Sequence, residues 1–437
     1  MLRGICLRTG LLAALLAGAV APSAAHAADL GGDCCGDLEA RVAGLEATTA
    51  AKGNRKVSLD ISGRVNANIL WWAENSSPLN PAANGATDQH SGLYFGNAAS
   101  FNDDPEITFS GSAKISADLS AGFSMRIDSK FSPADTQTAR QTGNAFTGDA
   151  TYVFLKSKSL GELRLGNQYS ASDDAYYVNF GGGTVGGLSG LNHTGTFLLR
   201  DANGKLSDTA YGSLLGEMSD YRDSRLMYIS PMLSGFTFKA DVGGDDTASA
   251  SLTWIGKVDT IEAEAGIGYQ VAHGGDGDCA DKGAQCTQGR DALSLANPWS
   301  TAGQNNLRAL GLSGSIWDTA SGFYVSGEYS HVYAAATGRQ DPTNWFAQAG
   351  WAKNASGLGV TTVYGSYDRT DNKAANDVSA HYWNLGIDQA IDAASSNVYL
   401  HYQHDQLDTD GVTGGSTGVA IPGQSVDSVT GGMVVRF

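Results

Sequence analysis

The most regular feature of the chain is an alternation of apolar and polar residues that begins near residue 56. Successive side chains of a β-strand point to opposite faces, so this period of two predicts strands with one apolar and one polar face. Runs of this design cover residues 107–119, 123–131, 261–269, 323–330, 344–351 and 398–403. The first run sets polar residues against Val57, Leu59, Ile61, Gly63, Val65, Ala67, Ile69 and Trp71.

Together with the less regular segments, the pattern predicts about sixteen strands, a number typical of membrane barrels. A soluble β-sandwich also alternates, but its strands are usually about five or six residues long. Several strands here reach about ten residues, enough to cross a bilayer when tilted. Because backbone groups in lipid must pair internally, we predict an all-β fold, a closed transmembrane antiparallel β-barrel. Aromatic residues near the strand ends predict its interfacial girdles: Trp71, Trp72, Tyr152, Tyr169, Tyr269, Trp317 and Trp351.

Both ends of the chain fit export to an outer membrane. Arg3 and Arg8 precede an apolar stretch, and Ala25-His26-Ala27 offers a cleavage site. Residues 1–27 are therefore predicted to be a signal peptide. The last strand alternates up to a terminal aromatic residue, Phe437. Such an ending resembles the assembly signal of outer-membrane barrels.

Residues 28–55 are a separate, periplasmic segment between the signal peptide and the barrel domain at 56–437. One apolar stripe recurs at helical spacing within it: Leu38, Val42, Leu45 and Thr49. A helix of about two heptads is marginal on its own in water. The segment is predicted either to form a short coiled coil when subunits associate or to remain a frayed helix or linker.

The composition agrees with an exported barrel. The chain has 57 Gly and 17% charged residues, with a mean hydropathy of −0.19, as expected for many strands joined by polar turns. No apolar run reaches the roughly 18 residues of a transmembrane helix. The net charge of −17 argues against nucleic-acid binding, which needs a basic surface. It fits acidic loops that face divalent cations at a cell surface, or simply a soluble exported chain.

The cysteines predict one disulfide. Cys6 lies in the signal peptide, and Cys34 and Cys35 are adjacent in the segment that follows. Cys279 and Cys286 bracket a short Asp/Gly-rich loop, and in an oxidising exported compartment they are the predicted pair. Free or metal-binding thiols are the alternative, but no companion ligands surround them. The pairing of Cys34 and Cys35 stays open.

The chain offers little catalytic or metal-binding chemistry. Residues 414–418 match the G-x-S-x-G pattern of hydrolases but lack its strand–turn–helix context. His401 and His404 are predicted on opposite faces of a strand, so they do not share a metal site. The acidic loop at 276–281 lacks the spacing of an EF-hand. We therefore predict that the protein is not an enzyme and has no cofactor and no metal.

Three stretches of the sequence resemble a known family. Residues 35–42 (CGDLEARV) and 52–63 (KGNRKVSLDISG) resemble the N-terminal signature and first strand of the general-diffusion porins of alphaproteobacteria. GELRLGNQ at 161–168 is similar to the strand before the constriction loop of many porins, and RLMYISP at 225–231 to the strand after it. The resemblance implies a homotrimer in the outer membrane. Its partners would be lipid, lipopolysaccharide and small hydrophilic solutes and ions.

Between these last two stretches lies a long connection, at about 169–220, and connections of this length are usually functional. In porins of this kind the third loop folds into the lumen, so the resemblance implies a constriction here. Beside Arg200 and Lys205, the connection carries Asp173, Asp174, Asp201, Asp208, Glu217 and Asp220. The inward faces of neighbouring strands supply a basic wall of Lys56, Arg64, Lys114, Arg126, Lys130 and Arg164.

An acidic loop that faces a basic wall would set an electric field across the narrowest part of the lumen. The alternative is that these charges solvate a wide lumen and pair with one another. The predicted function is an outer-membrane porin, a water-filled channel for the passive diffusion of small hydrophilic solutes and ions. A sugar-specific channel, hinted at by inward Tyr364 and Tyr399, is the alternative. A barrel enzyme is less favoured, because no nucleophile–base pair stands on one strand face.

Overall fold

The computed structural model describes most of the predicted barrel domain, within one compact unit that spans residues 54–437. The described residues are 57–86, 88–96, 105–130, 145–176, 197–215, 223–244, 247–272, 307–333, 340–373, 376–408, 412–413 and 419–437. The predicted signal peptide, the segment 28–55 and all five cysteines lie outside these residues. So do Lys56, Glu217 and Asp220 and the side chains of Lys130, Asp174 and Asp208.

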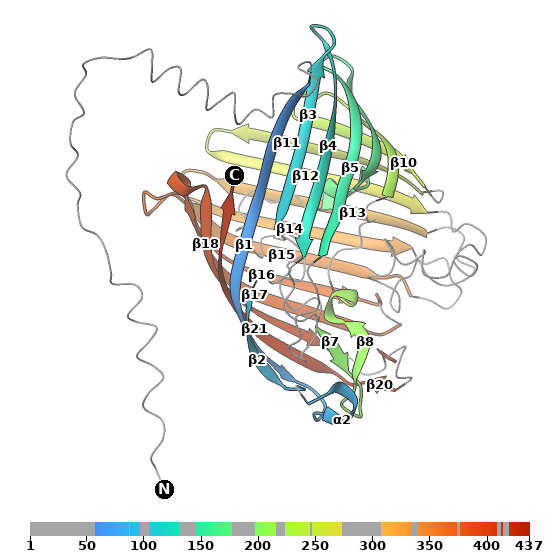
Figure 1. The fold of residues 1–437 in the computed structure, drawn as a ribbon, viewed down its shortest axis with the longest axis vertical. Helices are drawn as coiled ribbons and strands as arrows, with labels where there is room; N and C mark the ends of the chain where they lie inside the picture. Colours follow the sequence, from blue (N-terminus) through green and yellow to red (C-terminus); the bar gives the residue numbers. More distant parts are fainter. Residues whose placement is uncertain are drawn as a thin grey trace, which may run out of the picture. The chain divides into compact units, whose positions relative to one another are not determined.

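Sixteen long strands form one closed antiparallel sheet (Figure 1), which confirms the predicted barrel. Each strand pairs with its neighbours along this series, and the last strand pairs with the first. A seventeenth strand, β2 (Ser91–Gly96), pairs with the half of β1 beyond the end of β3. The long strands are β1 (Ser58–Asn75), β3 (Glu106–Lys114), β4 (Leu119–Lys130), β5 (Ala145–Ser157), β6 (Gly161–Gln168), β9 (Asp223–Ile229), β10 (Phe236–Gly243), β11 (Thr247–Val258), β12 (Ile261–Ala272), β13 (Leu307–Asp318), β14 (Phe323–Tyr333), β15 (Thr343–Lys353), β16 (Thr361–Asp371), β17 (Ser379–Ile391), β18 (Ser396–Leu407) and β21 (Gln424–Arg436).

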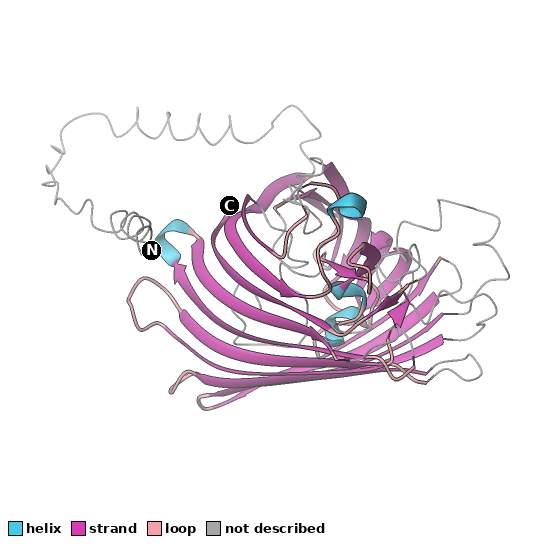
Figure 2. Cartoon of the chain, turned by 90° about the horizontal axis from the view of Figure 1, so that it is seen from below, coloured by secondary structure: helices cyan, strands magenta, loops and turns pink. Residues whose placement is uncertain are grey.

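The strands carry apolar side chains on the outside and polar side chains on the inside. On β18, Leu400 is 54% exposed, whereas Gln403 and Asp405 are fully buried. A soluble protein buries its apolar face instead. The reversed arrangement is stable where lipid covers the outside of the barrel. Figure 2 shows the strands curving around an interior that holds loops and short helical turns.

The barrel has a short-turn end and a loop end. Connections of a few residues, such as 115–118, 158–160 and 259–260, join strands at the short-turn end. The last strand also ends there, where the backbone N–H of Phe437 donates to the carbonyl of Gly63 at 3.0 Å. The long connections after β1, β6, β12 and β18 lie at the loop end. In outer-membrane barrels short turns face the periplasm and long loops face outward, so the loop end corresponds to the cell surface.

Outward aromatic residues gather at both ends of the barrel, as expected for interfacial girdles. Trp72, Tyr152, Tyr169 and Trp317 were predicted to belong to these girdles, but all four lie on the inner side. The rings of Tyr152 and Tyr169 contact inward arginines of the wall, and Trp317 packs against a buried cluster with Tyr324. Trp72 and Trp71 are consecutive, so only one of them can face lipid, and the ring of Trp72 packs edge-on against Phe197 inside the barrel. The outward residues are Trp71, Tyr269, Tyr329, Trp345 and Trp383 near the loop end and Phe236, Phe323, Trp351 and Phe437 near the short-turn end.

The remaining elements of the described residues are short. They are α2 (Pro81–Asn84), the 3-10 turns η1 (Asp173–Tyr176), η2 (Tyr211–Ser213) and η5 (Asp392–Ala394), and two small hairpins, β7 (Leu198–Arg200) with β8 (Leu206–Ala210) and β19 (Val412–Thr413) with β20 (Ala420–Ile421). None of the helices in this part of the chain has the length and apolar character needed to cross a membrane.

Candidate functional site

The connection after β6 enters the barrel and lies against the inner face of β10 and β11. The carboxylate of Asp241 accepts hydrogen bonds from the backbone N–H of Ala171 and, at 2.6 Å, from the hydroxyl of Ser249. The same carboxylate pairs with Arg225 at 2.8 Å. Ser251 donates to the carbonyl of Ala171 at 2.5 Å. These bonds fix the first residues of the connection to the wall.

Small residues on β12 and β13 let η1 approach the wall closely. A Cβ added at Gly268 would lie 2.9 Å from Ser172, and one added at Gly311 would lie 2.2 Å from the ring of Tyr176. The hydroxyl of Ser313 donates to the carbonyl of Ala175 at 2.5 Å. Because glycine and serine leave this space, the backbone of the connection lies flat on β12 and β13.

The later part of the connection forms the hairpin β7–β8, followed by η2, at the loop end. Figure 1 shows both strands beside α2 and β20. Leu199 of this hairpin is buried together with the inward side chains of Leu70, Phe346 and Tyr382, so the hairpin lies inside the barrel. All four belong to one buried apolar cluster of Leu70, Trp72, Tyr94, Phe197, Leu199, Tyr211, Leu214, Leu215, Phe346, Val378, Ala380, Tyr382, Leu407, Ile421 and Val426.

Two of the predicted wall arginines share an acidic neighbour. Arg64 on β1 and Arg126 on β4 lie 3.4 and 3.7 Å from the carboxylate of Glu106. Arg126 also pairs with Asp149. Both guanidinium groups stay partly exposed toward the lumen. Arg126 lies 5.8 Å from the ring centroid of Tyr169, a cation–π contact that brings the start of the connection next to the basic wall.

A second basic group stands on β6 and β10. Arg164 contacts Glu162 at 2.5 Å and lies 4.7 Å from the ring centroid of Tyr152. Lys239 interacts electrostatically with Arg164 and with Asp173 of η1. Lys239 was not predicted as a wall residue, although it occupies the polar face of the alternating run that became β10. Its contacts could not be predicted, because they join strands and the inward-folded connection.

The predicted acidic residues of the connection lie in different surroundings. Asp173 is on η1, within electrostatic range of Lys239. Asp201 is buried, and its carboxylate accepts the backbone N–H groups of Asn203 at 2.8 Å and Lys205 at 3.0 Å. This carboxylate stabilises the turn of the hairpin β7–β8.

The strands themselves charge the lumen asymmetrically. None of the described inward positions of β14–β18 carries Lys or Arg. Their inward charged residues are acidic: Glu328, Asp368, Asp388 and Asp405. On the other side of the ring, the inward faces of β1, β3–β6 and β10 carry Arg64, Lys114, Arg126, Lys156, Arg164 and Lys239, of which Lys114 is exposed at the short-turn end. The same faces also carry the carboxylates of Glu106, Glu162 and Asp241. The acidic side of the lumen was predicted to come from the connection alone.

The inward tyrosines are packed against the wall. Tyr364 and Tyr399 both point into the barrel, as predicted. The hydroxyl of Tyr364 lies 3.2 Å from Nδ1 of His401, and that of Tyr399 donates to Asn66 at 2.9 Å. The ring of Tyr364 lies so close to Gly386 that an added Cβ would be 2.3 Å away. Such buried side chains do not offer sugars an exposed aromatic surface.

Metal-binding geometry is absent from the part of the chain that the structure describes, where no three His, Cys, Asp or Glu side chains are grouped to hold an ion. His401 is buried on the inner face. His404 is on the outer face, 2.9 Å from Asp427. The prediction that these two histidines occupy opposite faces is confirmed.

The chain matches known outer-membrane proteins in sequence family and in fold. A family model described as Gram-negative porin matches residues 12–411. A loop-deletion mutant of OmpT, an outer membrane protein of Vibrio cholerae, is 12% identical, with coverage of 87% of this chain and 100% of that chain and a TM-score of 0.50. The anion-selective porin from Comamonas acidovorans is 14% identical, with coverage of 87% of this chain and 100% of that chain and a TM-score of 0.50. The outer membrane channel DcaP of Acinetobacter baumannii is 10% identical, with coverage of 87% of this chain and 99% of that chain and a TM-score of 0.50.

The match to the family model assigns the chain to a protein family, which the similarity to solved structures alone does not do. No curated protein matches the chain, and at these identities the solved structures show the fold alone. The family model, in contrast, covers most of the chain and agrees with a closed barrel that has a folded-in connection. Family and fold favour a channel over an enzyme and place the protein in the outer membrane. On this agreement, the chain belongs to the Gram-negative porins.

Proposed function

We propose that this porin lets small hydrophilic solutes and ions diffuse passively through a lumen that has basic side chains on one side and only acidic charged side chains on the described strands of the other. The observation that supports the proposal best is the basic wall of Arg64, Arg126 and Arg164. It faces strands whose inward charged residues are acidic. The inward-folded connection meets this wall where Tyr169 contacts Arg126.

Opposite charges across a water-filled lumen act on whatever passes between them. Walls of low dielectric focus the field into the water. A polar solute can orient its dipole in that field and exchange hydrogen bonds with the polar wall. An apolar solute would disturb the ordered water without gaining such contacts. Ion pairs such as Arg64–Glu106 lower the net charge of the basic side, but they leave its guanidinium groups facing the lumen.

We also propose the branch of the family, the oligomeric state and the processing of the chain. The resemblance of residues 35–63 supports membership in the alphaproteobacterial general-diffusion branch, and with it a homotrimer with lipid and lipopolysaccharide around it. A signal peptide at 1–27 and a Cys279–Cys286 disulfide fit an exported barrel. The role of Phe437 as an assembly signal rests on its place at the end of the last strand.

Swelling of proteoliposomes in sugars of increasing size tests the diffusion proposal. Passive diffusion predicts uptake rates that fall smoothly with solute size and do not saturate with concentration. Saturable uptake of one sugar, with exclusion of others of equal size, would instead support a substrate-specific channel. Hydrolysis of the vesicle lipids would support a barrel enzyme.

A further inference from the structure

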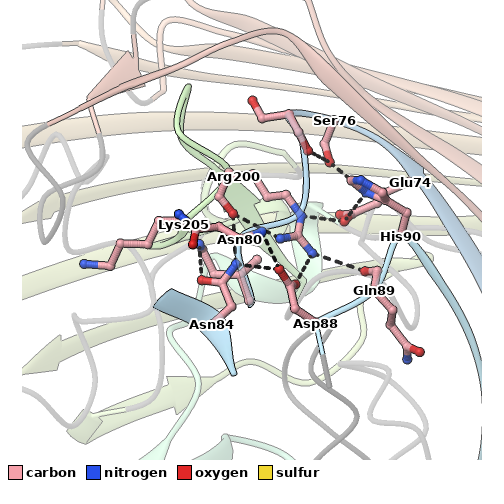
Figure 3. A network of polar contacts seen from close by, with 12 residues as sticks. Glu74, Ser76, Asn80, Asn84, Asp88, Gln89, His90, Arg200 and Lys205 are labelled. Carbon is pink, nitrogen blue, oxygen red and sulfur yellow. Dashed lines mark hydrogen bonds and ion pairs between the residues drawn. The ribbon is translucent and has the colours of Figure 1, made fainter. Parts of the chain in front are cut away.

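The hairpin β7–β8 is joined to the mouth of the barrel by a buried arginine (Figure 3). Nε of Arg200 donates to Glu74 at 2.6 Å, and Nη2 donates to Asp88 at 2.7 Å. The exposed fractions of these three side chains are 0%, 1% and 0%. Further hydrogen bonds from the guanidinium reach the carbonyls of Gly204 at 3.2 Å and Gln89 at 3.1 Å. One side chain thus ties the hairpin to the end of β1 and to the connection that follows it.

Both carboxylates have additional partners. The second oxygen of Asp88 accepts the backbone N–H of Asn80 at 2.8 Å and the side-chain amide of Asn84 at 3.0 Å. Glu74 lies 3.1 Å from Nδ1 of His90. Buried charges are tolerated only when they are paired and hydrogen-bonded in this way. The network therefore orders residues 74–90 around Arg200.

The turn of the hairpin fits closely against the same connection. Gly204 has φ +77°, and a Cβ added there would lie 1.8 Å from the carbonyl oxygen of Pro78. The amide of Asn84 donates to the carbonyl of Gly204 at 2.9 Å and accepts the backbone N–H of Leu206 at 2.9 Å. Both the backbone conformation and the space at this turn require glycine.

Two further contacts fasten the hairpin segment to other parts of the barrel mouth. The side-chain amide of Gln424, the first residue of β21, pairs reciprocally with the backbone N–H and carbonyl of Arg200, both at 2.9 Å. Lys373, which follows β16, donates to the carbonyl of Leu215 at 2.6 Å. The segment from Arg200 to Leu215 is thus held from several sides.

We propose that Arg200 is a positioning residue that sets the permeability limit of the pore by holding the hairpin β7–β8 inside the mouth. The inference rests on the proposed diffusion function. Because Arg200 is fully buried, it touches no solute, and its effect passes through the hairpin. The size of solute that can pass is then set by the cross-section that the hairpin leaves free, not by the diameter of the barrel.

The burial and charge of this network predict how substitutions in it affect the position of the hairpin. Removing only the guanidinium leaves Glu74 and Asp88 buried without their shared counter-charge, and their desolvation favours displacement of the hairpin. Lysine is a poor substitute, because one ammonium cannot reproduce the planar fork that reaches both carboxylates. Neutralising the two acids together with the arginine removes the buried charge and should let the apolar cluster hold the hairpin again.

Single-channel recording with neutral polyethylene glycols of graded size tests this inference. In Arg200→Met, polymers that are excluded from wild-type channels should enter and lower the conductance. Gly204→Ala should move the limit in the same direction through its clash with Pro78. The triple variant Arg200→Met, Glu74→Gln, Asp88→Asn should return toward the wild-type limit, a rescue that a general loss of stability would not give.

Arg369→Met is the matched control, because Arg369 is also ion-paired, at 2.9 Å from Asp371, but stands on the outer face. It should keep the wild-type polymer limit. Folding of each variant is checked by its heat-dependent shift on gels, and Gly204→Ala carries the test if Arg200→Met does not fold. An unchanged limit in folded variant channels would overturn the inference and leave the diffusion function standing. Folded wild-type protein without channels would overturn both.

Discussion

At the scale of single residues, the interior of the barrel depends on buried charges that have specific partners. Arg200 lies between Glu74 and Asp88, and Arg225 pairs with Asp241. Such pairs add little net stability compared with well-packed apolar residues, but removing one partner costs about 3–5 kcal/mol. Substitutions that break a pair should therefore lower the free energy of unfolding far more than their small change in side-chain volume suggests.

Asp241→Ala tests this at the start of the connection. The substitution leaves Arg225 buried without its carboxylate and removes the acceptor of Ala171 and Ser249. The free energy of unfolding, measured by urea titration in lipid vesicles, should fall by about 3 kcal/mol or more. Asp371→Ala, which breaks a partly exposed pair on the outer face, should cost under about 1 kcal/mol. Equal costs for the two variants would contradict this view.

The pH dependence of stability should depend on Asp88. Burial opposes ionisation of this carboxyl, but hydrogen bonds led by that from Arg200 outweigh burial and hold the pKa of Asp88 below its ordinary value. A lowered folded-state pKa stabilises the fold above the ordinary carboxyl pKa of about 4, and this stabilisation is lost as pH falls through the lower folded value. The urea concentration at the midpoint of unfolding, measured from neutral to strongly acidic pH, should therefore fall once the pH is below about 4. The fall should be less steep in Asp88→Asn. The same slope in both proteins would count against the role of Asp88.

The sequence shows which side chains point inward but not which of them meet. Arg64, Arg126 and Arg164 were predicted on the inner wall from alternation, and the structure places them there. Arg200 was predicted only as a basic residue of an acidic loop. Its partners stand 126 and 112 positions away in the chain, so no local pattern could reveal its burial.

At the scale of elements, the two parts of the inward connection are fixed to different sides of the barrel. The first part, with η1, lies on β10–β13 through short hydrogen bonds and glycine positions. The second part, the hairpin β7–β8, packs into an apolar cluster built with inward residues of β1, β15, β17, β18 and β21. Different sets of strands therefore hold the two described parts of the connection in place.

Gly311→Ala should disturb the first anchor. The new methyl group would meet the ring of Tyr176 at 2.2 Å, so η1 must shift away from β13. We expect a loss of about 1–3 kcal/mol in unfolding free energy and noisier single-channel current. Gly314→Ala on the same strand is the matched control, because its nearest neighbour would be 3.7 Å away. Identical traces for the two variants would show that η1 does not depend on this contact.

The strands could be predicted from the sequence because each needs only its own period of two. The hairpin β7–β8 could not, because its residue Leu199 is buried in a cluster with residues of β1, β2, β15, β17, β18, β20 and β21. Trp72 was wrongly predicted to face lipid, because the same period of two that puts Trp71 outside puts Trp72 inside; only its packing against Phe197 lay beyond the local pattern. Local pattern gives the wall of this barrel, while long-range packing decides what fills it.

At the scale of the whole molecule, inward basic residues gather on one side of the barrel, where they stand among carboxylates such as Glu106, Asp149 and Glu162. Basic residues stand on β1, β3–β6 and β10, and the inward charged residues of β14–β18 are acidic. The field between them acts on every ion that crosses, so ion selectivity should respond to the balance of charge and not to any one residue.

Removing basic charge should raise the preference for cations. In a variant with Arg126→Ala and Arg164→Ala, Asp149 loses its ion pair with Arg126. Glu106 and Glu162 each lose one of two basic partners and keep Arg64 and Lys156. The permeability ratio of potassium to chloride, from reversal potentials in a salt gradient, should rise on the order of twofold. Lys158→Ala, at an exposed short turn, should leave the ratio unchanged. An unaltered ratio in the double variant would argue that the wall charges only pair with one another.

The most direct test of the diffusion channel is the conductance of the purified, folded protein in a planar bilayer. The account predicts large steps in current that stay proportional to voltage, grouped in threes if the proposed trimer forms. Such steps require a continuous water-filled path past the inward-folded connection. Protein shown to be folded that gives no steps would contradict the account, because the connection would then close the barrel instead of narrowing it.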